Sequence, residues 1–248
     1  MLLSIVIPVF NEEALVATLL GKIVDLQLAD GMAKEIVIVD DGSTDGTLQV
    51  LRAFHAAHPE VRLLVHEKNR GKGAAVRTGM EAAHGDILII QDADLEYDPE
   101  DIRQVVRPIA AGEAQVVYGS RILREKALGR SGVLGLVTGK HPHSYVLAYL
   151  GGVTITQWIN LITGANLTDE PTCYKSFRRT ALEGIGIDSD DFAWEPEITL
   201  KLLLRGVEIR EVPIAYHPRK NRDGKKINWR DGVKALWTAG KYRFRKTP

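Results

Sequence analysis

The sequence has a single cysteine, Cys173, so it cannot form an internal disulfide bond. A chain of this kind is expected in a reducing compartment, with Cys173 as a buried structural thiol. The first ten residues, MLLSIVIPVF, have neither the basic region nor the small-residue cleavage site of a signal peptide. We therefore expect a cytoplasmic protein.

Several common catalytic motifs are also missing. The segment NRGKG at 69–73 resembles a phosphate loop but lacks the Walker spacing and the Ser or Thr after the lysine. No Gly-rich dinucleotide fingerprint follows the first expected strand, and none of the seven histidines belongs to an HExxH or paired-ligand pattern. These absences argue against the usual ATP and NAD sites and against a histidine metal site.

Neither sign of charge is in excess, because 32 Lys and Arg residues balance 32 Asp and Glu residues. Their distribution is uneven, however: residues 201–248 contain 14 basic and 4 acidic side chains, and residues 1–200 contain 18 and 28. The basic end fits a phosphate-bearing or membrane partner, although a solvated tail would give the same pattern.

The chain has 248 residues, 45% of them hydrophobic, enough for one large domain or a domain with an added lobe. Strand and helix patterns alternate over residues 1–120, which predicts a doubly wound α/β fold with a mainly parallel sheet. Strands are expected at 3–10, 35–40, 61–66, 86–90, 114–119, 172–177 and 207–214. Helices are expected after Asn11, which would cap the first, after Asp45, and at 73–83, 99–112, 143–163 and 196–206. A long basic loop is expected at 121–140.

Polar segments follow the first five expected strands. They are PVFNEE at 8–13, VDDGSTDGT at 39–47, HEKNRGKG at 66–73, QDADLE at 91–96 and YGSR at 118–121. Each alone has the composition of an ordinary turn. Ligands of open α/β sheets bind beyond the carboxyl ends of the strands, so the five together predict one polar site.

Residues 92–101 contain six acidic side chains directly after an apolar strand. Asp92 and Asp94 are suitably spaced to offer oxygen ligands to a hard divalent cation, which would relieve their repulsion and bridge to a diphosphate. The later acids, from Asp98 to Asp101, precede or begin a helix, where negative charge favours the positive end of the dipole. We interpret the run as a metal site followed by a helix start; the alternative is a set of solvated turn and cap residues.

Taken together, VIPVFNEE, VIVDDGSTDGT, NRGKGAAVRTGM, DADLE, YGSR and EVPIAYHPR resemble the family 2 glycosyltransferases of the GT-A fold. The branch most similar in motifs is the dolichyl- and polyprenyl-phosphate sugar synthases. The resemblance covers nearly the whole chain and is strongest over residues 1–121. It implies a nucleotide-sugar-binding α/β part at 1–120 and an acceptor-binding part of the same domain at 121–248.

The resemblance also implies individual roles and partners. The donor would be a nucleoside-diphosphate sugar, the acceptor a polyprenyl phosphate, the cofactor Mg²⁺ or Mn²⁺, and no nucleic acid would be bound. The donor residues would be Pro8, Phe10, Asn11, Glu12, Asp41, Asp92, Ala93 and Asp94, with Asp92, Asp94 and Glu96 at the metal. The acceptor residues would be Arg121, Lys140, Ser144, Arg219, Lys225 and Lys226.

The acceptor decides whether a general base is needed. A phosphate monoester has a second pKa of about 6, so it is mostly dianionic at neutral pH and needs cations rather than a base. A hydroxyl acceptor requires a base, for which Asp169 and Glu195 are the candidates. A soluble or polymeric hydroxyl acceptor therefore stays open, as do a nucleotidyltransferase and a non-catalytic sugar-nucleotide binding module.

Two segments bear on the membrane. Residues 141–168 contain no Lys, Arg, Asp or Glu, but their many Gly, Thr and Asn residues favour a buried or interfacial helix over a membrane span. Residues 227–248 mix Val233, Leu236 and Trp237 on one expected helical face with basic side chains. We expect a protein peripheral on the cytoplasmic membrane face, unless this apolar face packs on the core.

Overall fold

In a computed structural model, the protein is described at residues 1–29, 31–129, 143–218 and 229–244. Its centre is a seven-stranded sheet in the order β3-β2-β1-β4-β6-β5-β7. The strands are β1 (Leu2–Val9), β2 (Ala33–Asp40), β3 (Arg62–Val65), β4 (Ile87–Ile90), β5 (Val116–Ser120), β6 (Lys175–Arg178) and β7 (Ile209–Pro213). All pairs are parallel except those of β6, which runs antiparallel to both β4 and β5. The predicted doubly wound, mainly parallel sheet is confirmed.

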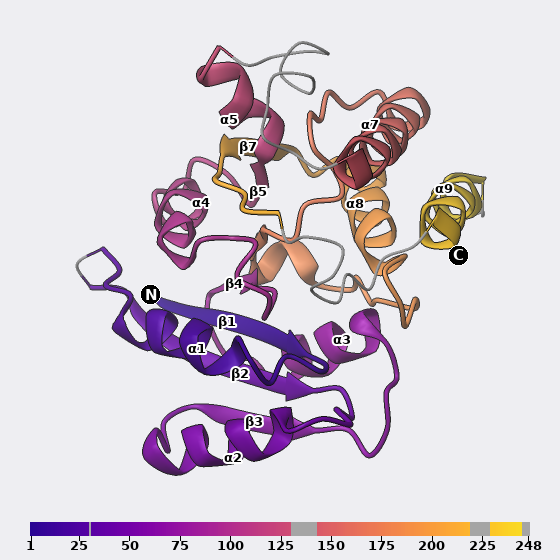
Figure 1. Cartoon of the computed structure of the whole chain (residues 1–248). Coiled ribbons are helices and arrows are strands. Elements are labelled where there is room, and N and C mark those ends of the chain that lie inside the picture. Colours follow the sequence, from indigo (N-terminus) through magenta and orange to yellow (C-terminus); the bar gives the residue numbers. More distant parts are fainter. Residues whose placement is uncertain (30, 130–142, 219–228, 245–248) are drawn as a thin grey trace.

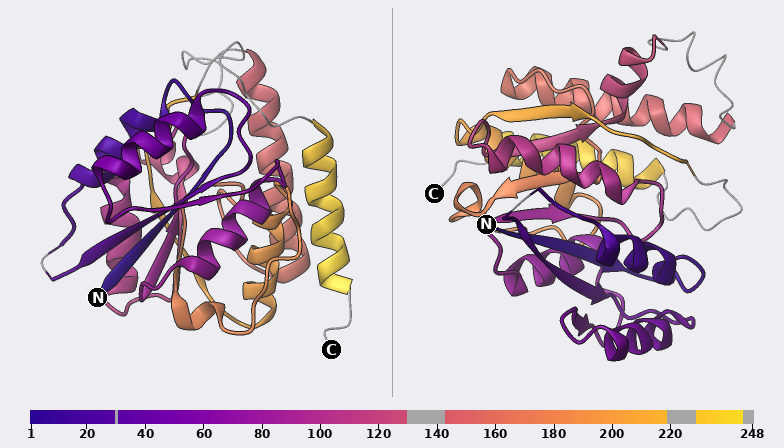
Figure 2. Two further views of the ribbon diagram at one scale, coloured as in Figure 1. Left: turned by 90° about the horizontal axis from the view of Figure 1, so that it is seen from below. Right: turned by 90° about the vertical axis from the view of Figure 1, so that its left-hand side faces the viewer.

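Helices lie on both sides of this sheet (Figures 1 and 2). They are α1 (Val16–Asp25), α2 (Thr47–Ala57), α3 (Lys72–Ala82), α4 (Ile102–Ala110), α5 (Arg121–Ala127), α7 (His143–Thr163), α8 (Trp194–Leu204) and α9 (Trp229–Phe244). β1 is almost wholly buried because it is central and covered on both faces, which explains its near-continuous apolar sequence. The strands β6 and β7, which follow residue 120, belong to the same sheet as β1, so residues before and after 120 share one core.

Two local expectations were wrong. Residues 121–127 are helical rather than a loop, because the Ser120 hydroxyl accepts a hydrogen bond from the Leu123 N–H at 3.0 Å and caps α5. Asn11 does not cap α1, which begins only at Val16. Asn11 instead adopts a left-handed conformation (φ 49°), and its side chain accepts a hydrogen bond from the Thr44 N–H at 2.8 Å.

A second, smaller core joins α7, α8 and α9. Ile155 and Ile159 of α7 are buried together with Ala235 and Ala239 of α9. The predicted helix at 143–163 is confirmed as α7, and its uncharged inner face meets neighbouring helices. Within the described ranges, no helix has the length and apolar character needed to cross a membrane.

Candidate functional site

The carboxyl ends of β1, β2 and β3 surround a cleft of about 430 Å³. Phe10 lies on one side of it, the turn from Gly42 to Thr44 on another, and the segment from His66 to Asn69 on a third. Asp40 also lines the cleft, and its Oδ1 atom is buried without a hydrogen-bond partner among the described residues. An aromatic ring beside polar loops suits a flat, polar ring such as a nucleobase.

Asp41 holds the loops around this cleft together. Its Oδ1 atom lies 2.7 Å from His66 Nδ1 and accepts the Arg70 N–H at 2.9 Å, and its Oδ2 atom accepts the Gly71 N–H at 2.8 Å. Gly71 has φ 99°, and a Cβ there would lie 2.4 Å from the Asp190 carbonyl oxygen. Both oxygens of Asp41 are thus engaged by groups of the same chain, whereas Asp40 and Glu67 are the acidic residues among those that line the cleft.

Asp92, the first acid of the run, lies in an ion-pair network. Lys72, the first residue of α3, places Nζ 2.9 Å from Asp92 Oδ1 and 3.0 Å from Glu195 Oε1. The three side chains are only 13%, 20% and 11% exposed. Burial alone would lower the pKa of Lys72, but the carboxylates of Asp92 and Glu195 raise it well above its ordinary value. Lys72 therefore remains charged and fixes Asp92 beside Glu195, which comes from the first turn of α8.

Asp94 lies in the turn after Asp92. Its Oδ1 atom accepts the Glu96 N–H at 3.0 Å, and Leu95 between them has φ 59°. Asp94 also lines a second cleft, of about 1000 Å³, together with Asn11 and Glu12 after β1. Asp94 thus reaches the open edge of the sheet, whereas Asp92 is tied to Lys72.

The second half of the acidic run begins a helix, as predicted. Asp98 caps a short 3₁₀ turn (Pro99–Asp101) by accepting the Glu100 N–H at 3.2 Å, and α4 follows directly. Glu96, between the two halves, accepts a hydrogen bond from the Tyr216 hydroxyl at 2.7 Å. Burial raises the pKa of Tyr216, which keeps this phenol protonated as the donor.

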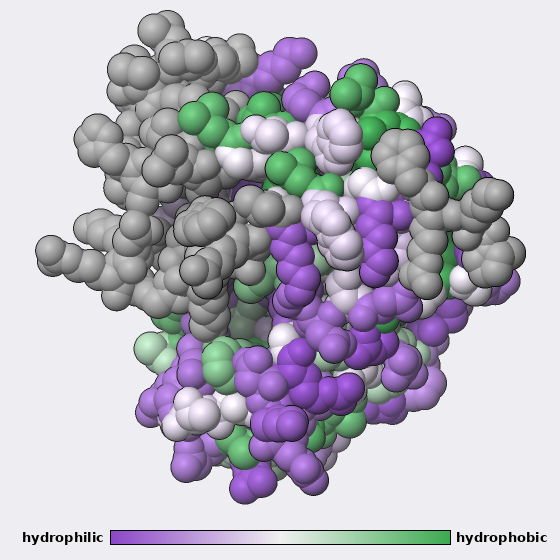
Figure 3. Space-filling model, turned by 90° about the vertical axis from the view of Figure 1, so that its right-hand side faces the viewer, coloured by the Kyte–Doolittle hydropathy of each residue, from purple (hydrophilic) through white to green (hydrophobic). Residues whose placement is uncertain are grey.

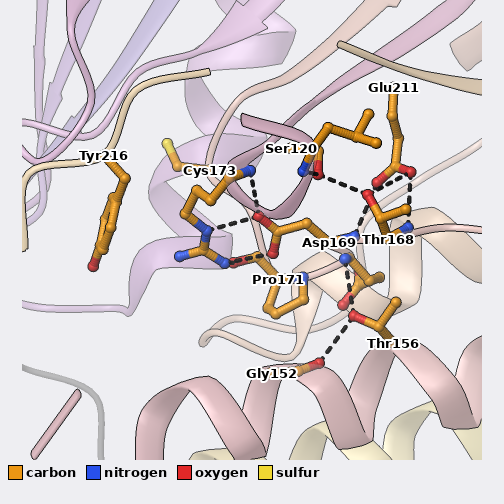
Figure 4. Close-up of polar contacts among 12 residues, drawn as sticks. Ser120, Gly152, Thr156, Thr168, Asp169, Pro171, Cys173, Glu211 and Tyr216 are labelled. Atoms are coloured by element: carbon orange, nitrogen blue, oxygen red, sulfur yellow. Dashed lines mark hydrogen bonds and ion pairs between the residues drawn. The ribbon is translucent and has the colours of Figure 1, made fainter. Parts of the chain in front are cut away.

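Arg121 and Asp169 form a bidentate pair at the end of β5. Arg121 Nε donates to Asp169 Oδ2 at 2.8 Å, and Nη2 donates to Oδ1 at 2.7 Å (Figure 4). Nη2 also donates to the Pro171 carbonyl at 2.8 Å. The Arg121 side chain is 21% exposed and that of Asp169 only 5%. The residue predicted to bind acceptor phosphate and the predicted base are thus each other's partners.

A scaffold behind this pair holds Asp169 in place. Glu211 of β7 accepts the N–H groups of Thr168 and Asp169 at 2.7 and 2.9 Å, as Figure 4 shows. The hydroxyl oxygens of Thr168 and Ser120 lie 2.7 Å apart. The Arg121–Asp169 pair is therefore braced by two neighbouring strands.

Several predicted residues cannot be compared with the structure. Lys140, Arg219, Lys225 and Lys226 lie outside the described residues, as does the side chain of Ser144 in α7. Pro8 lies near the end of β1, and Ala93 lies in the turn that follows β4. Three residues escaped the sequence analysis: Lys72, Asp40 and Tyr216. For Lys72 a signal existed, since NRGKG lies in one of the polar segments that follow the strands and in one of the motifs of the family resemblance.

The residue types fit a divalent cation. In the described part of the chain no three His, Cys, Asp or Glu residues form a ready-made metal cluster. Mg²⁺, however, needs only one or two protein carboxylates when substrate phosphates and water supply the other oxygens. Asp94, at the rim of a cleft beside Asp92, offers such a partial site.

The sequence model of the family described as Glycosyl transferase family 2 matches residues 4–186. The chain is 28% identical over 245 residues to the low-salt glycan biosynthesis hexosyltransferase Agl6 of Haloferax volcanii, covering 98% of this chain and 55% of that protein. It is 28% identical over 220 residues to the dodecaprenyl-phosphate galacturonate synthase of Rhizobium johnstonii, covering 88% and 60%. It is 27% identical over 227 residues to the dolichol-phosphate mannosyltransferase of Pyrococcus furiosus, covering 91% and 59%. The chain thus spans little more than half the length of these relatives.

Among solved structures, a similar one is glucosyl-3-phosphoglycerate synthase from Mycobacterium tuberculosis in complex with Mn²⁺, UDP and phosphoglyceric acid. The TM-score is 0.69 at 20% identity, and the match covers 98% of this chain and 78% of that one. At this identity the likeness bears on the fold alone, and it confirms the predicted α/β GT-A architecture.

Proposed function

Because the chain belongs to glycosyl transferase family 2, we propose that it moves a hexose, with inversion, from a nucleoside-diphosphate sugar to a polyprenyl phosphate. Two of the relatives above are a dodecaprenyl-phosphate galacturonate synthase and a dolichol-phosphate mannosyltransferase, which supports this acceptor class. The cleft lined by Phe10 and Asp40 would bind the nucleobase of the donor. The end of β4 would bind the diphosphate of the donor.

The main observation in support of a phosphate acceptor is that both candidate bases, Asp169 and Glu195, are held in ion pairs. Both oxygens of Asp169 accept hydrogen bonds from Arg121, and Glu195 accepts one from Lys72. A carboxylate held in this way is poorly placed to take a proton from a hydroxyl acceptor. A phosphate dianion needs no such base, and it does need a cation such as Arg121.

The reaction then requires little proton chemistry. An oxygen of the acceptor phosphate attacks the anomeric carbon, the bond from that carbon to the diphosphate oxygen breaks, and a nucleoside diphosphate leaves. Arg121 has two further N–H groups on Nη1, without a partner among the described residues, which would hold the acceptor phosphate. Asp169 would position Arg121 rather than act on the substrate.

The residues at the end of β4 would hold the metal and the donor. Asp94 is proposed as the metal ligand, with Glu96 nearby, and Asp92 as the partner of Lys72 beside the sugar. A bound Mg²⁺ or Mn²⁺ would stabilise the charge that develops on the leaving diphosphate.

The function is tested with UDP- and GDP-sugars, Mg²⁺ or Mn²⁺, and undecaprenyl phosphate in detergent. We expect a glycosylated lipid and one nucleoside diphosphate for each sugar transferred. Release of pyrophosphate would identify a nucleotidyltransferase instead. Binding of nucleotide sugars with no turnover on any acceptor would indicate a non-catalytic module.

Replacing Lys72 by methionine is expected to destabilise the protein by about 3 kcal/mol, because two largely buried carboxylates lose their shared cation. It should also weaken UDP-sugar binding, since Asp92 and Glu195 would repel each other. Urea denaturation and calorimetric titration with UDP-sugar measure the two effects. Lys201→Met is the matched control: Lys201 pairs with Asp188 and Glu197, so this variant should lose stability but keep donor affinity. Unchanged donor binding in Lys72→Met would exclude Lys72 from the donor site.

The same proposal requires access to a lipid. Figure 3 shows the side of the molecule that carries α7 and α9, with hydrophobic and hydrophilic side chains interspersed. Ala235 and Ala239 of α9 face the core, whereas Trp237 is 63% exposed, with Lys241 Nζ 5.3 Å from its ring. Leu161 of α7 is 76% exposed. One face of α9 thus packs on the core, and Trp237 and Lys241 would meet anionic lipid.

Replacing Trp237 by serine is expected to lower binding to liposomes of anionic lipid by roughly tenfold, because an exposed aromatic side chain no longer enters the interface. Flotation at low and high salt measures the change. Leu204→Ser, at the exposed end of α8, is the control and should float like the wild type. Wild-type protein that never floats, with or without acceptor lipid, would refute the membrane part of the proposal.

A further inference from the structure

The segment from Ile214 to His217 crosses the carboxyl edge of the sheet just after β7. The Ile214 N–H donates to the Ser120 carbonyl at 3.1 Å, beside Arg121. The His217 N–H donates to the Glu96 carbonyl at 2.8 Å, in the turn after Asp94. This short segment therefore links the end of β5 to the acidic turn after β4, two strand ends that β6 separates in the sheet.

The side chain of Tyr216 also connects the turn after β4 with the end of β5, because it contacts both Glu96 and Arg121. Its hydroxyl donates to Glu96 Oε2 at 2.7 Å. Its ring centre lies 5.0 Å from Arg121 Cζ, so the guanidinium stacks over the aromatic face. The ring also contacts Tyr97, at 5.4 Å between centres, and this contact supports it from a further side. Figure 4 shows Tyr216 beside the network around Asp169.

Asp169 and the Pro171 carbonyl hold the Nε and Nη2 side of the Arg121 guanidinium. The Tyr216 ring packs against the face of this guanidinium, so it restricts tilting of the plane about that side and directs Nη1. The hydroxyl of Tyr216 likewise selects one orientation of the Glu96 carboxylate.

We infer that Tyr216 is a positioning residue that sets Glu96, beside the metal site, and Arg121, at the acceptor site, in one geometry. The inference rests on the proposed function for the meaning of these two sites. The hydroxyl acts on the metal side and the ring acts on the acceptor side, so the two roles can be separated by substitution.

The test compares Tyr216→Phe with Tyr216→Leu. Tyr216→Phe keeps the ring and loses the hydroxyl, so we expect the half-saturating Mn²⁺ concentration, measured by electron paramagnetic resonance with UDP present, to rise about tenfold. The KM for undecaprenyl phosphate should stay within about twofold of the wild type, because the cation–π contact remains. Tyr216→Leu should show the same Mn²⁺ effect and, in addition, about a fivefold rise in acceptor KM.

Two controls separate this role from a general loss of packing. Tyr242→Phe also removes a hydrogen bond from a tyrosine to a carboxylate, here to Asp188 at 2.8 Å, and should change neither quantity. In a Glu96→Ala background, Tyr216→Phe should have no further effect on Mn²⁺ binding, because the partner of the hydroxyl is gone.

The link to Glu96 would be overturned if Tyr216→Phe bound Mn²⁺ as tightly as the wild type does. It would also be overturned if Tyr216→Phe weakened Mn²⁺ binding as strongly in the Glu96→Ala background as in the wild type. An unchanged acceptor KM in Tyr216→Leu would overturn the link to Arg121. Wild-type protein that binds Mn²⁺ and UDP but does not glycosylate polyprenyl phosphate would refute the proposed acceptor, and the Mn²⁺ titrations would still decide the role of the hydroxyl.

Discussion

Replacing Asp94 by alanine is expected to reduce transfer by roughly 10³-fold, because several kcal/mol of charge stabilisation at the leaving diphosphate would be lost. UDP binding should also lose most of its dependence on Mg²⁺ or Mn²⁺. Initial rates over a metal titration, together with calorimetry with and without metal, measure both effects.

Asp98→Ala is the matched control from the same acidic run. Asp98 caps the turn before α4, so its loss should cost about 1 kcal/mol of stability and leave kcat within about twofold. If Asp94→Ala had full activity and an unchanged metal dependence, the assignment of a metal site to the end of β4 would be wrong.

Replacing Arg121 by methionine is expected to lower kcat/KM for polyprenyl phosphate by about 100-fold or more, since the acceptor loses a partly buried, hydrogen-bonded cation. UDP affinity should stay within about twofold. The single variant leaves Asp169 unpaired in a buried position, so Arg121→Met is best studied together with Asp169→Asn to preserve folding.

Asp169→Asn alone distinguishes the two roles of this carboxylate. If Asp169 only positions Arg121, the loss should be about tenfold and appear mainly in acceptor KM. A general base would cost about 10²- to 10⁴-fold in kcat with little change in acceptor KM. If Arg121→Met lost UDP affinity as strongly as it lost kcat/KM for polyprenyl phosphate, Arg121 would not act on the acceptor in particular.

The strand ends that form the site could be predicted because their signals are local. An apolar run followed by Asp92 and Asp94 predicts a strand that ends in carboxylates, and parallel strands bring such ends to one edge. The helix start at Asp98 could be predicted for the same reason, since a capping residue bonds to residues close to it in the sequence.

The pairings within the site could not be predicted in the same way. Lys72 and Glu195 are 123 residues apart, and Tyr216 and Glu96 are 120 apart. Each of these partners has several residues of opposite charge or polarity available elsewhere, and only the packed fold selects one. The same holds for β6, whose place between β4 and β5 depends on long-range pairing rather than on its own pattern.

These pairings changed the interpretation of the acceptor. From sequence, Asp169 and Glu195 were open as general bases and Arg121 as a phosphate ligand. Because Asp169 is bound to Arg121 and Glu195 is bound to Lys72, neither carboxylate is well placed to act as a base, and this supports our proposal of an acceptor that brings its own negative charge. Whether the acceptor attacks as a phosphate or as a hydroxyl is therefore the central question.

A direct comparison of undecaprenyl phosphate with undecaprenol, at matched detergent and donor concentrations, tests this point in the unmodified protein. The two lipids share the same chain and differ only in the group that attacks the sugar. Our account predicts transfer to the phosphate and none above background to the alcohol. Glycosylation of undecaprenol with a kcat/KM similar to that of the phosphate would contradict it.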